Sequence, residues 1–208
     1  MSVFFRYSTS ILFSTLLLTG CSSTPQKIDL PSRNQVTIEN HNRKLNELHN
    51  WTAEGKIAAS NTTQAHSASF IWKQQGPAYK IQFFGPLGIG GGYLKGNTKN
   101  KKAIFVTSNG QRREALSPEK LIYDETGLYF PVSSLQYWIK GLPDPTHPLN
   151  YSIHNKTGLV TSLKQNAWEI QYVDYIQHKQ DPNLILPCNL KIKKENNSLK
   201  LVINYWDK

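Results

Sequence analysis

The chain has 208 residues, with 24 lysines and arginines against 14 aspartates and glutamates, and its formal net charge is +10 at pH 7. This length suits one domain around one sizeable core. Two cysteines, Cys21 and Cys188, are too few for a disulfide framework, and a lone thiol is best tolerated when it is buried. The basic balance fits an anionic membrane surface or an acidic protein partner as well as simple solubility.

The first residues have the pattern of a secretory signal. Arg6 supplies a basic start, and an apolar run follows over residues 11–18. This run is too short to span a bilayer. Cys21 comes directly after Leu18-Thr19-Gly20, which is the pattern of a bacterial lipobox. The pattern predicts cleavage before Cys21 and a lipid on that residue; an ordinary signal whose cleavage site adjoins a cysteine is the alternative.

The lipobox interpretation sets the expected organisation. Ser22 stands where, by analogy with enterobacterial lipoproteins, an aspartate would hold the protein in the inner membrane, so an outer-membrane address on the periplasmic face is favoured. This address argues against a nucleic-acid partner. We expect a signal peptide at 1–20, a lipidated polar tether at 21–35 and one folded domain at 36–208.

Short strands dominate the domain. The spacing of Ile38, Leu45 and Leu48 predicts an amphipathic helix within 36–50. After it, alternating apolar residues predict strands at 52–59, 65–74, 78–84, 92–95 and 103–107. Residues 108–111 then predict a hairpin turn.

Two further helices interrupt the strands. Ser117-Pro118 is an N-cap followed by a first-turn proline, and Gly127 is a stop. Pro131 opens the next helix and Gly141 ends it. Strands resume at 159–165, 168–175, 186–194 and 198–206. The chain is therefore predicted to be mainly β, an antiparallel meander of nine to eleven strands with three helices.

No motif for catalysis or cofactor binding stands out. The patterns of serine hydrolases, zinc proteases and phosphate-binding loops are missing from the sequence. The six histidines lie in polar or loop contexts without metal-ligand spacing, and we expect them on the surface. Glu119, Asp124 and Glu125 share a helix and are interpreted as a solvated face. We expect no enzyme activity, no cofactor and no metal.

The most informative stretch is the sequence FFGPLGIGGG at 83–92. Glycine and proline predict a loop, yet Leu87 and Ile89 at its tip are apolar. Apolar residues exposed on a loop commonly mark contact with a membrane or partner. Burying one leucine in lipid is worth roughly 2 kcal/mol, enough to bias a tethered domain toward a bilayer. A leucine that folds back into the core is equally compatible, and a phosphate cradle would need a Lys-Ser/Thr ending that is missing.

Aromatic residues are the second signal, with five tryptophans, ten tyrosines and eight phenylalanines. Several fall on strand faces, so the concave face of a curved sheet could hold a packed core or bind acyl chains. From the residues alone, a packed core is the favoured interpretation. The candidates for an acyl-chain cavity are Phe70, Trp72, Ile81, Phe83, Trp138 and Trp168.

Four segments together resemble the LolB family of outer-membrane lipoprotein receptors. The segments are the lipobox ending at Cys21, WTAEGKI at 51–57, GPLG at 85–88 and LQYWIKGLP at 135–143. The last is the most specific, because its helix, tryptophan and Gly-Leu-Pro stop all agree with the family. The resemblance covers nearly the whole chain after the signal.

The resemblance implies an incomplete antiparallel β-barrel of about 11 strands, with about three helices closing an apolar cavity. It implies a monomeric lipoprotein that accepts acylated lipoproteins from a LolA-like periplasmic carrier and inserts them into outer-membrane lipid, without nucleotide or metal. The family's protruding loop leucine corresponds to Leu87; whether it acts alone or with Ile89 stays open, because a longer glycine run follows. A lipoprotein that binds another amphiphile, such as a glycolipid, is the alternative.

Overall fold

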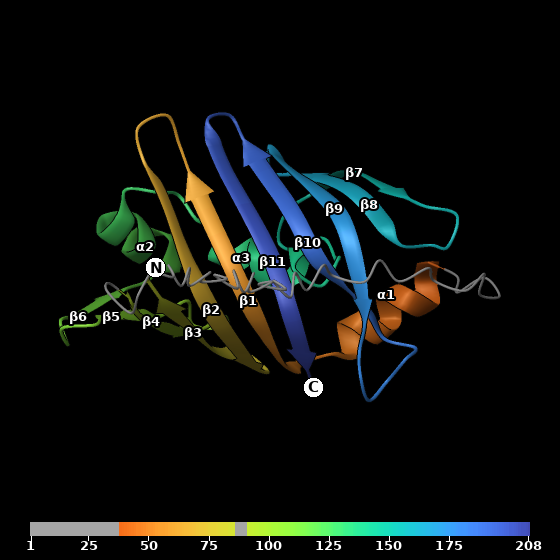
Figure 1. Ribbon diagram of the computed structural model, residues 1–208, viewed down its shortest axis with the longest axis horizontal. Helices are drawn as coiled ribbons and strands as arrows, with labels where there is room; N and C mark the ends of the chain where they lie inside the picture. Colours follow the sequence, from red (N-terminus) through yellow and green to blue (C-terminus); the bar gives the residue numbers. More distant parts are fainter. Residues whose placement is uncertain (1–37, 86–90) are drawn as a thin grey trace, which may run out of the picture.

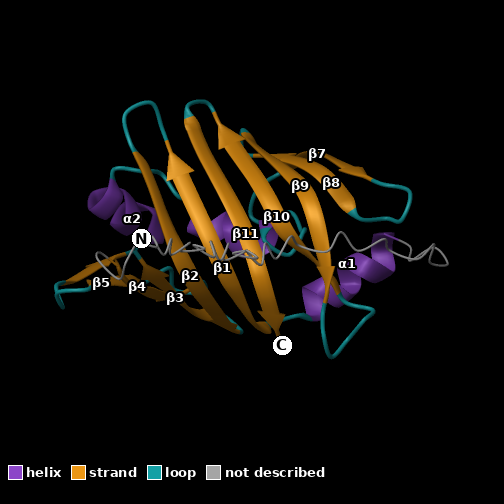
Figure 2. Cartoon of the chain, in the orientation of Figure 1, coloured by secondary structure: helices purple, strands orange, loops and turns teal. Residues whose placement is uncertain are grey.

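The computed structural model describes residues 38–85 and 91–208, with side chains from residue 40 onward. Cys21, Leu87 and Ile89 therefore lie outside the described residues. Three helices and eleven strands make up the described part (Figures 1 and 2). In chain order they are α1 (Ile38–Glu47), β1 (Asn50–Ser60), β2 (Ala65–Gln75), β3 (Ala78–Phe84), β4 (Gly91–Asn97), β5 (Ala103–Thr107), β6 (Arg112–Ala115), α2 (Pro118–Thr126), α3 (Val132–Trp138), β7 (Leu149–His154), β8 (Val160–Gln165), β9 (Trp168–Gln177), β10 (Ile185–Lys194) and β11 (Asn197–Asp207).

All of these strands form one antiparallel sheet in the order β6-β5-β4-β3-β2-β1-β11-β10-β9-β8-β7. The chain starts in the middle of the sheet, runs out to one edge at β6, crosses to the opposite edge at β7 and returns to the middle. Helices α2 and α3 make this crossing and lie across one face of the long central strands (Figure 1). The edge strands β6 and β7 do not pair with each other in the described sheet, so the predicted incomplete barrel with three helices is confirmed.

The inner face of the sheet carries the core. Trp72, Ile81 and Leu94 lie opposite one another on β2, β3 and β4, and each is at most 1% exposed. Because successive residues of a strand point to opposite faces, their neighbours in sequence point outward. Two aromatic clusters lie in the core: Trp51, Trp72, Tyr79 and Trp206, and Trp138 with Trp168, against which the exposed Tyr129 stacks.

The ends of α2 agree with the sequence prediction. Ser117 accepts a hydrogen bond from the Lys120 amide on its side-chain oxygen, at 3.2 Å, and Pro118 occupies the first turn. Gly127 has a φ of 68°, and its amide donates to the Tyr123 carbonyl at 2.7 Å. Glycine adopts this left-handed conformation without the steric cost that other residues incur. Pro131 precedes α3, which ends slightly before the predicted stop at Gly141.

Lys140 joins the end of α3 to α1. Its ammonium donates to the backbone carbonyls of Leu45 and Leu48, both at 3.1 Å, and the residue is 7% exposed. These carbonyls belong to the last turn of α1 and to the residue after it, where a helix has no further amides to donate to its carbonyls. Burial lowers the pKa of Lys140 from 10.5 to about 8. The lysine thus fastens α1 to the crossover by a contact that spans more than ninety residues of sequence.

The structure corrects two expectations. The segment 149–154 is a strand, β7, although its residues do not alternate between buried and exposed positions. This strand lies at the sheet edge with register shifts, so the core does not impose a pattern on it. His41 and His178 are 5% and 2% exposed, so the expectation that all histidines lie on the surface was wrong. Among the described residues, no helix has the length and apolar character to cross a bilayer.

Gly55 is expected to be intolerant of any side chain. The pairing of β1 with β11 shifts register between Glu54 and Gly55, and a Cβ on Gly55 would overlap the Val202 carbonyl oxygen and lie 2.9 Å from the Ile203 Cα. Because backbone atoms cannot move aside cheaply, Gly55→Ala should lower the free energy of unfolding by about 1–3 kcal/mol. Urea unfolding measures this loss. Lys56→Ala, at the next and exposed position, should stay within about 0.5 kcal/mol, and equal stabilities of the two variants would contradict the bulge.

The buried Lys140 should make stability depend on pH. Its pKa is about 8 in the folded protein and 10.5 in the unfolded chain, so between these values the unfolded chain binds more protons and stability rises with pH. From pH 8 to 9.5 the wild type should gain about 2 kcal/mol of unfolding free energy relative to Lys140→Met. Cys188 and the buried tyrosines contribute equally to the pH dependence of both proteins, so their contributions cancel in this difference. Lys156→Met, at an exposed position, should show the same rise of unfolding free energy with pH as the wild type. If the difference between the wild type and Lys140→Met did not change with pH, Lys140 would not have a lowered pKa in the folded protein.

Candidate functional site

An apolar cavity of about 190 Å³ lies between α2 and the inner face of the sheet half that runs from β1 to β5. Strands β1, β2, β3 and β5, helix α2 and the segment after α2 supply its aromatic and aliphatic walls. The apolar lining residues are Ile57, Ala59, Ala68, Phe83, Phe105, Ile122, Leu128 and Phe130. The polar lining consists of His66, Ser67, Glu125 and Thr126. Gly91, the first residue of β4, also lines the cavity.

The predicted acyl-chain candidates divide into two groups. Phe83 lines the cavity. The other five are core residues at most 3% exposed and are not among the residues that line it: Phe70, Trp72, Ile81, Trp138 and Trp168. Trp138 and Trp168 lie in contact with each other, with ring centres 6.2 Å apart, in the part of the core covered by α3.

Small residues create the space. Ile57 pairs with Ala68, and Ala59 pairs with His66, at the end of the β1–β2 ribbon. Both alanines lie on the inner face, where larger side chains elsewhere reach the helices. Sequence reasoning searched for large apolar residues and so missed these positions. Alanines at inward positions of a strand pattern, next to bulky residues at other inward positions, are the signal that could have indicated the cavity.

Helix α2 covers the cavity and is held there by few polar contacts. Arg113 on β6 forms an ion pair with Glu125 at 3.4 Å, with side chains 47% and 29% exposed. The Asn61 side-chain amide donates to the Gly127 carbonyl at 3.4 Å. Exposed ion pairs contribute little stability, so the polar contacts alone do not fix this helix firmly. Its buried side chains, Leu121 and Ile122, provide the larger attachment.

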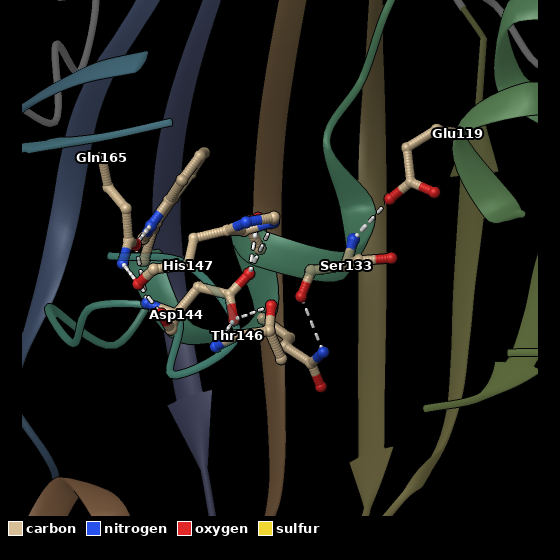
Figure 3. Close-up of polar contacts among 9 residues, drawn as sticks. Glu119, Ser133, Asp144, Thr146, His147 and Gln165 are labelled. Atoms are coloured by element: carbon tan, nitrogen blue, oxygen red, sulfur yellow. Dashed lines mark hydrogen bonds and ion pairs between the residues drawn. The ribbon is translucent and has the colours of Figure 1, made fainter. Parts of the chain in front are cut away.

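A buried polar network fixes α3 and the loop after it (Figure 3). Gln165 on β8 accepts hydrogen bonds from the Trp138 indole at 2.9 Å and the Asp144 amide at 2.8 Å. Its side-chain amide donates to the carbonyls of Asp144 and His147, both at 2.8 Å. Gln165 is fully buried and uses both ends of its amide, so it anchors this region to the sheet.

The Asp144 carboxylate is equally occupied. It accepts from the Ser134 hydroxyl at 2.7 Å and from the Thr146 amide and hydroxyl at 2.9 and 2.7 Å. His147 Nε2 approaches the Asp144 carboxylate only to 3.9 Å. Nearby, Glu119 accepts from the Ser133 amide at 2.8 Å and joins α2 to α3 (Figure 3). These contacts position the crossover between the two edges of the sheet.

Burial keeps two other titratable side chains, Cys188 and His41, uncharged near neutral pH. Burial raises the pKa of the Cys188 thiol to about 11, which keeps it protonated and unreactive near neutral pH. Burial lowers the pKa of His41 to about 4, so this histidine is neutral. No cluster of three or more histidines, cysteines or carboxylates within the described ranges could hold a metal ion. The chemistry that the described site offers is the binding of an apolar group.

Comparison with a solved structure gives a weak likeness. A LolA superfamily protein from Nitrosomonas europaea aligns with a TM-score of 0.48 and 6% sequence identity, over 83% of this chain and 93% of that chain. A likeness at this level has no bearing on function.

Sequence comparison places the chain in a family. A model of the family described as Outer membrane lipoprotein LolB matches residues 49–206. A protein named Outer-membrane lipoprotein LolB from Francisella tularensis subsp. tularensis is 31% identical over 202 residues, covering 97% of this chain and 94% of that protein. A protein of the same name from Alkalilimnicola ehrlichii is 32% identical over 194 residues, covering 93% and 92%. The chain therefore belongs to the LolB family of outer-membrane lipoproteins.

Proposed function

We propose that this protein accepts lipoproteins from a LolA-like periplasmic carrier by binding their acyl chains, and inserts them into the outer membrane. In this proposal residues 1–20 are removed, Cys21 carries the lipid anchor and residues 21–35 tether a domain that begins at residue 36. The observation that carries the proposal is the apolar cavity between α2 and the β1–β5 half of the sheet. The names of the relatives agree with the outer-membrane address expected from the sequence.

The size of the cavity indicates how binding would proceed. Ligand pockets usually measure about 300–1,000 Å³, and this cavity measures about 190 Å³. It can take part of an acyl chain as it stands, and more once α2 moves away from the sheet. The half-exposed ion pair between Arg113 and Glu125 resists this movement only weakly. The cavity is therefore interpreted as the closed form of an expandable site.

Transfer needs differences in affinity and no covalent step. The domain must bind acyl chains better than the carrier does, and the bilayer must bind them better still. The predicted loop with Leu87 and Ile89 falls between β3 and β4 in the sequence, and Gly91, the first residue of β4, lines the cavity. Apolar residues on this loop would bring the membrane close to the bound acyl chains. The site and the loop would thus serve successive steps, uptake and release.

A transfer assay tests the proposal. Carrier loaded with a labelled lipoprotein is mixed with residues 22–208, and the mixture is then offered to liposomes. We expect the label to pass from the carrier to this domain and then to the liposomes. Label that stays on the carrier while the domain is folded would refute the proposal. Competition by a glycolipid at equal concentration would instead favour a receptor for another amphiphile.

Filling the cavity should block uptake. Ala59→Phe places a ring in the cavity, and excluding two methylene groups of a bound chain, at about 0.8 kcal/mol each, weakens binding about tenfold. The measurement is the amount of labelled lipoprotein taken from the carrier at increasing domain concentration. Ala58→Phe is the matched control, because Ala58 is exposed on the opposite face of β1 and should leave uptake unchanged. Equal uptake by both variants would exclude this cavity as the acyl-chain site.

Charging the loop should separate uptake from release. Leu87→Glu is expected to retain folding and uptake and to slow release into liposomes at least tenfold, because a carboxylate opposes entry into lipid. The same change at Ile89 tells whether the second residue contributes. Circular dichroism and the two transfer steps are measured on each variant. Loss of folding in Leu87→Glu would show instead that Leu87 is a core residue.

A further inference from the structure

Three lysines form a row on the outer face of the sheet, on the side opposite the cavity. Lys73 on β2 pairs in register with Lys80 on β3, and Lys80 pairs with Lys95 on β4. All three are exposed. Directly opposite residues on neighbouring antiparallel strands have Cβ atoms about 5 Å apart, so the row crosses the sheet over about 10 Å. We call these three residues the lysine row.

The charges of the lysine row are not neutralised within the described part of the protein. None of the three has an ion-pair partner there, and the Lys80 ammonium lies over the Tyr93 ring, 4.6 Å from its centre. The row lies in a shallow groove of about 460 Å³ that Lys102 also lines. Glu114 is the one carboxylate among the described residues that line the groove, and it pairs with Arg112 at 3.2 Å. The groove is therefore strongly positive.

This arrangement opposes folding. Like charges directly opposite each other on neighbouring strands are destabilising, and the row contains two such pairs in succession. Packing in the core requires apolar residues at the inner positions of these strands, but folding would allow any polar residue at the outer positions. An anion seated on the row would remove the repulsion. An anion bound there would therefore gain more binding free energy than one bound to a single lysine, because it would also relieve the repulsion among the three.

The surroundings of the row favour lipid phosphates over a folded acidic protein. Lysines carry compact charges on flexible stems and do not offer the planar fork with which arginine matches a fixed carboxylate. Phe84 lies on the same outer face of β3 and is 41% exposed, and Tyr93 is its near neighbour on β4. Aromatic residues beside basic ones are the pattern of surfaces that contact the membrane interface. The lipid anchor would also hold such a surface close to a bilayer.

We propose that the lysine row binds the phosphate groups of anionic phospholipids, so that the β3–β4 hairpin rests on the membrane with its outer face down. This surface is separate from the cavity, whose walls are on the inner face of the same strands. From the proposed function, this proposal takes only the lipid anchor on Cys21. It assigns to the outer face a role in orienting the domain while the inner face holds acyl chains.

Vesicle binding of residues 22–208 tests the row without the lipid anchor. The described residues form one sheet around one core, so this chain retains the whole domain. Vesicles of phosphatidylcholine alone are compared with vesicles of phosphatidylcholine and phosphatidylglycerol. We expect flotation with the anionic vesicles only, and loss of binding at high salt. Neutralising the row with Lys73→Gln, Lys80→Gln and Lys95→Gln together should weaken binding about a hundredfold, at about fivefold for each lysine.

A matched control removes the same charge elsewhere on the outer face. The control variant carries Lys56→Gln, Lys191→Gln and Lys193→Gln, which lie on β1 and β10, are all exposed and are not opposite one another in register. This triple variant should lose less than about fivefold in binding. Equal losses in the two triple variants would show that net charge is sensed, and would overturn the proposal. Binding to neutral vesicles as strong as to anionic ones would overturn it too.

Two further measurements distinguish lipid binding by the row from a loss of folding and from contact with an acidic protein. The row variant should have a thermal midpoint at or above that of the wild type at low salt, because like-charge pairs have been removed, so weak binding cannot reflect unfolding. It should also take lipoprotein from the carrier normally when vesicles are left out, whatever the outcome for the cavity. If it bound vesicles normally but took up lipoprotein more slowly, the partner would be an acidic protein surface and the lipid proposal would fail.

Discussion

The burial of one face of an open sheet is the constraint on which this structure depends. The strands from β6 to β7 form a single sheet whose edges do not meet within the described residues, so the sheet cannot enclose its own apolar face. The chain solves this at the point where it must cross from one edge to the other. The crossing segment contains α2 and α3, and their apolar sides cover the inner face (Figure 1). One segment thus serves both as the connection and as the cover.

The two covering helices are attached in different ways. α3 is tied to the sheet and to α1 by buried hydrogen bonds from Trp138, Lys140 and Tyr172. Buried polar contacts that are fully satisfied are costly to break, because each broken one leaves an unpaired group away from water. α2 has a partly exposed ion pair and a cavity beneath part of it. The cover is therefore attached more firmly over one half of the sheet than over the half that contains the cavity.

The same strands also present two different chemistries to their two faces. At successive positions of β2, Trp72 points into the core and Lys73 points out, and β3 and β4 repeat this with Ile81 and Leu94 inside and two lysines outside. Since a one-residue slip in register would exchange the faces, the core also fixes the lysine row. Acyl-chain binding on the inside and phosphate binding on the outside would then be held in a constant relation by one pattern of pairing.

The sequence alone determined the elements whose signals are local. The helix start at Ser117-Pro118, the stop at Gly127 and most strands follow from capping chemistry and from alternation, and the structure agrees with them. The family follows from the segments at 51–57 and 135–143, and the comparison with relatives confirms it. Edge strand β7 escaped prediction because no core packs against it to impose alternation.

Only the tertiary structure decided where the cavity lies. A cavity is space that side chains leave unfilled, and it depends on which residues of distant strands and of α2 face each other. The large aromatic residues that sequence reasoning chose fill the core, with Phe83 at the cavity wall, while Ala59 and Ala68 leave the room. The lysine row has the same origin. Its three members are seven and fifteen residues apart in the chain, and only strand register brings them side by side.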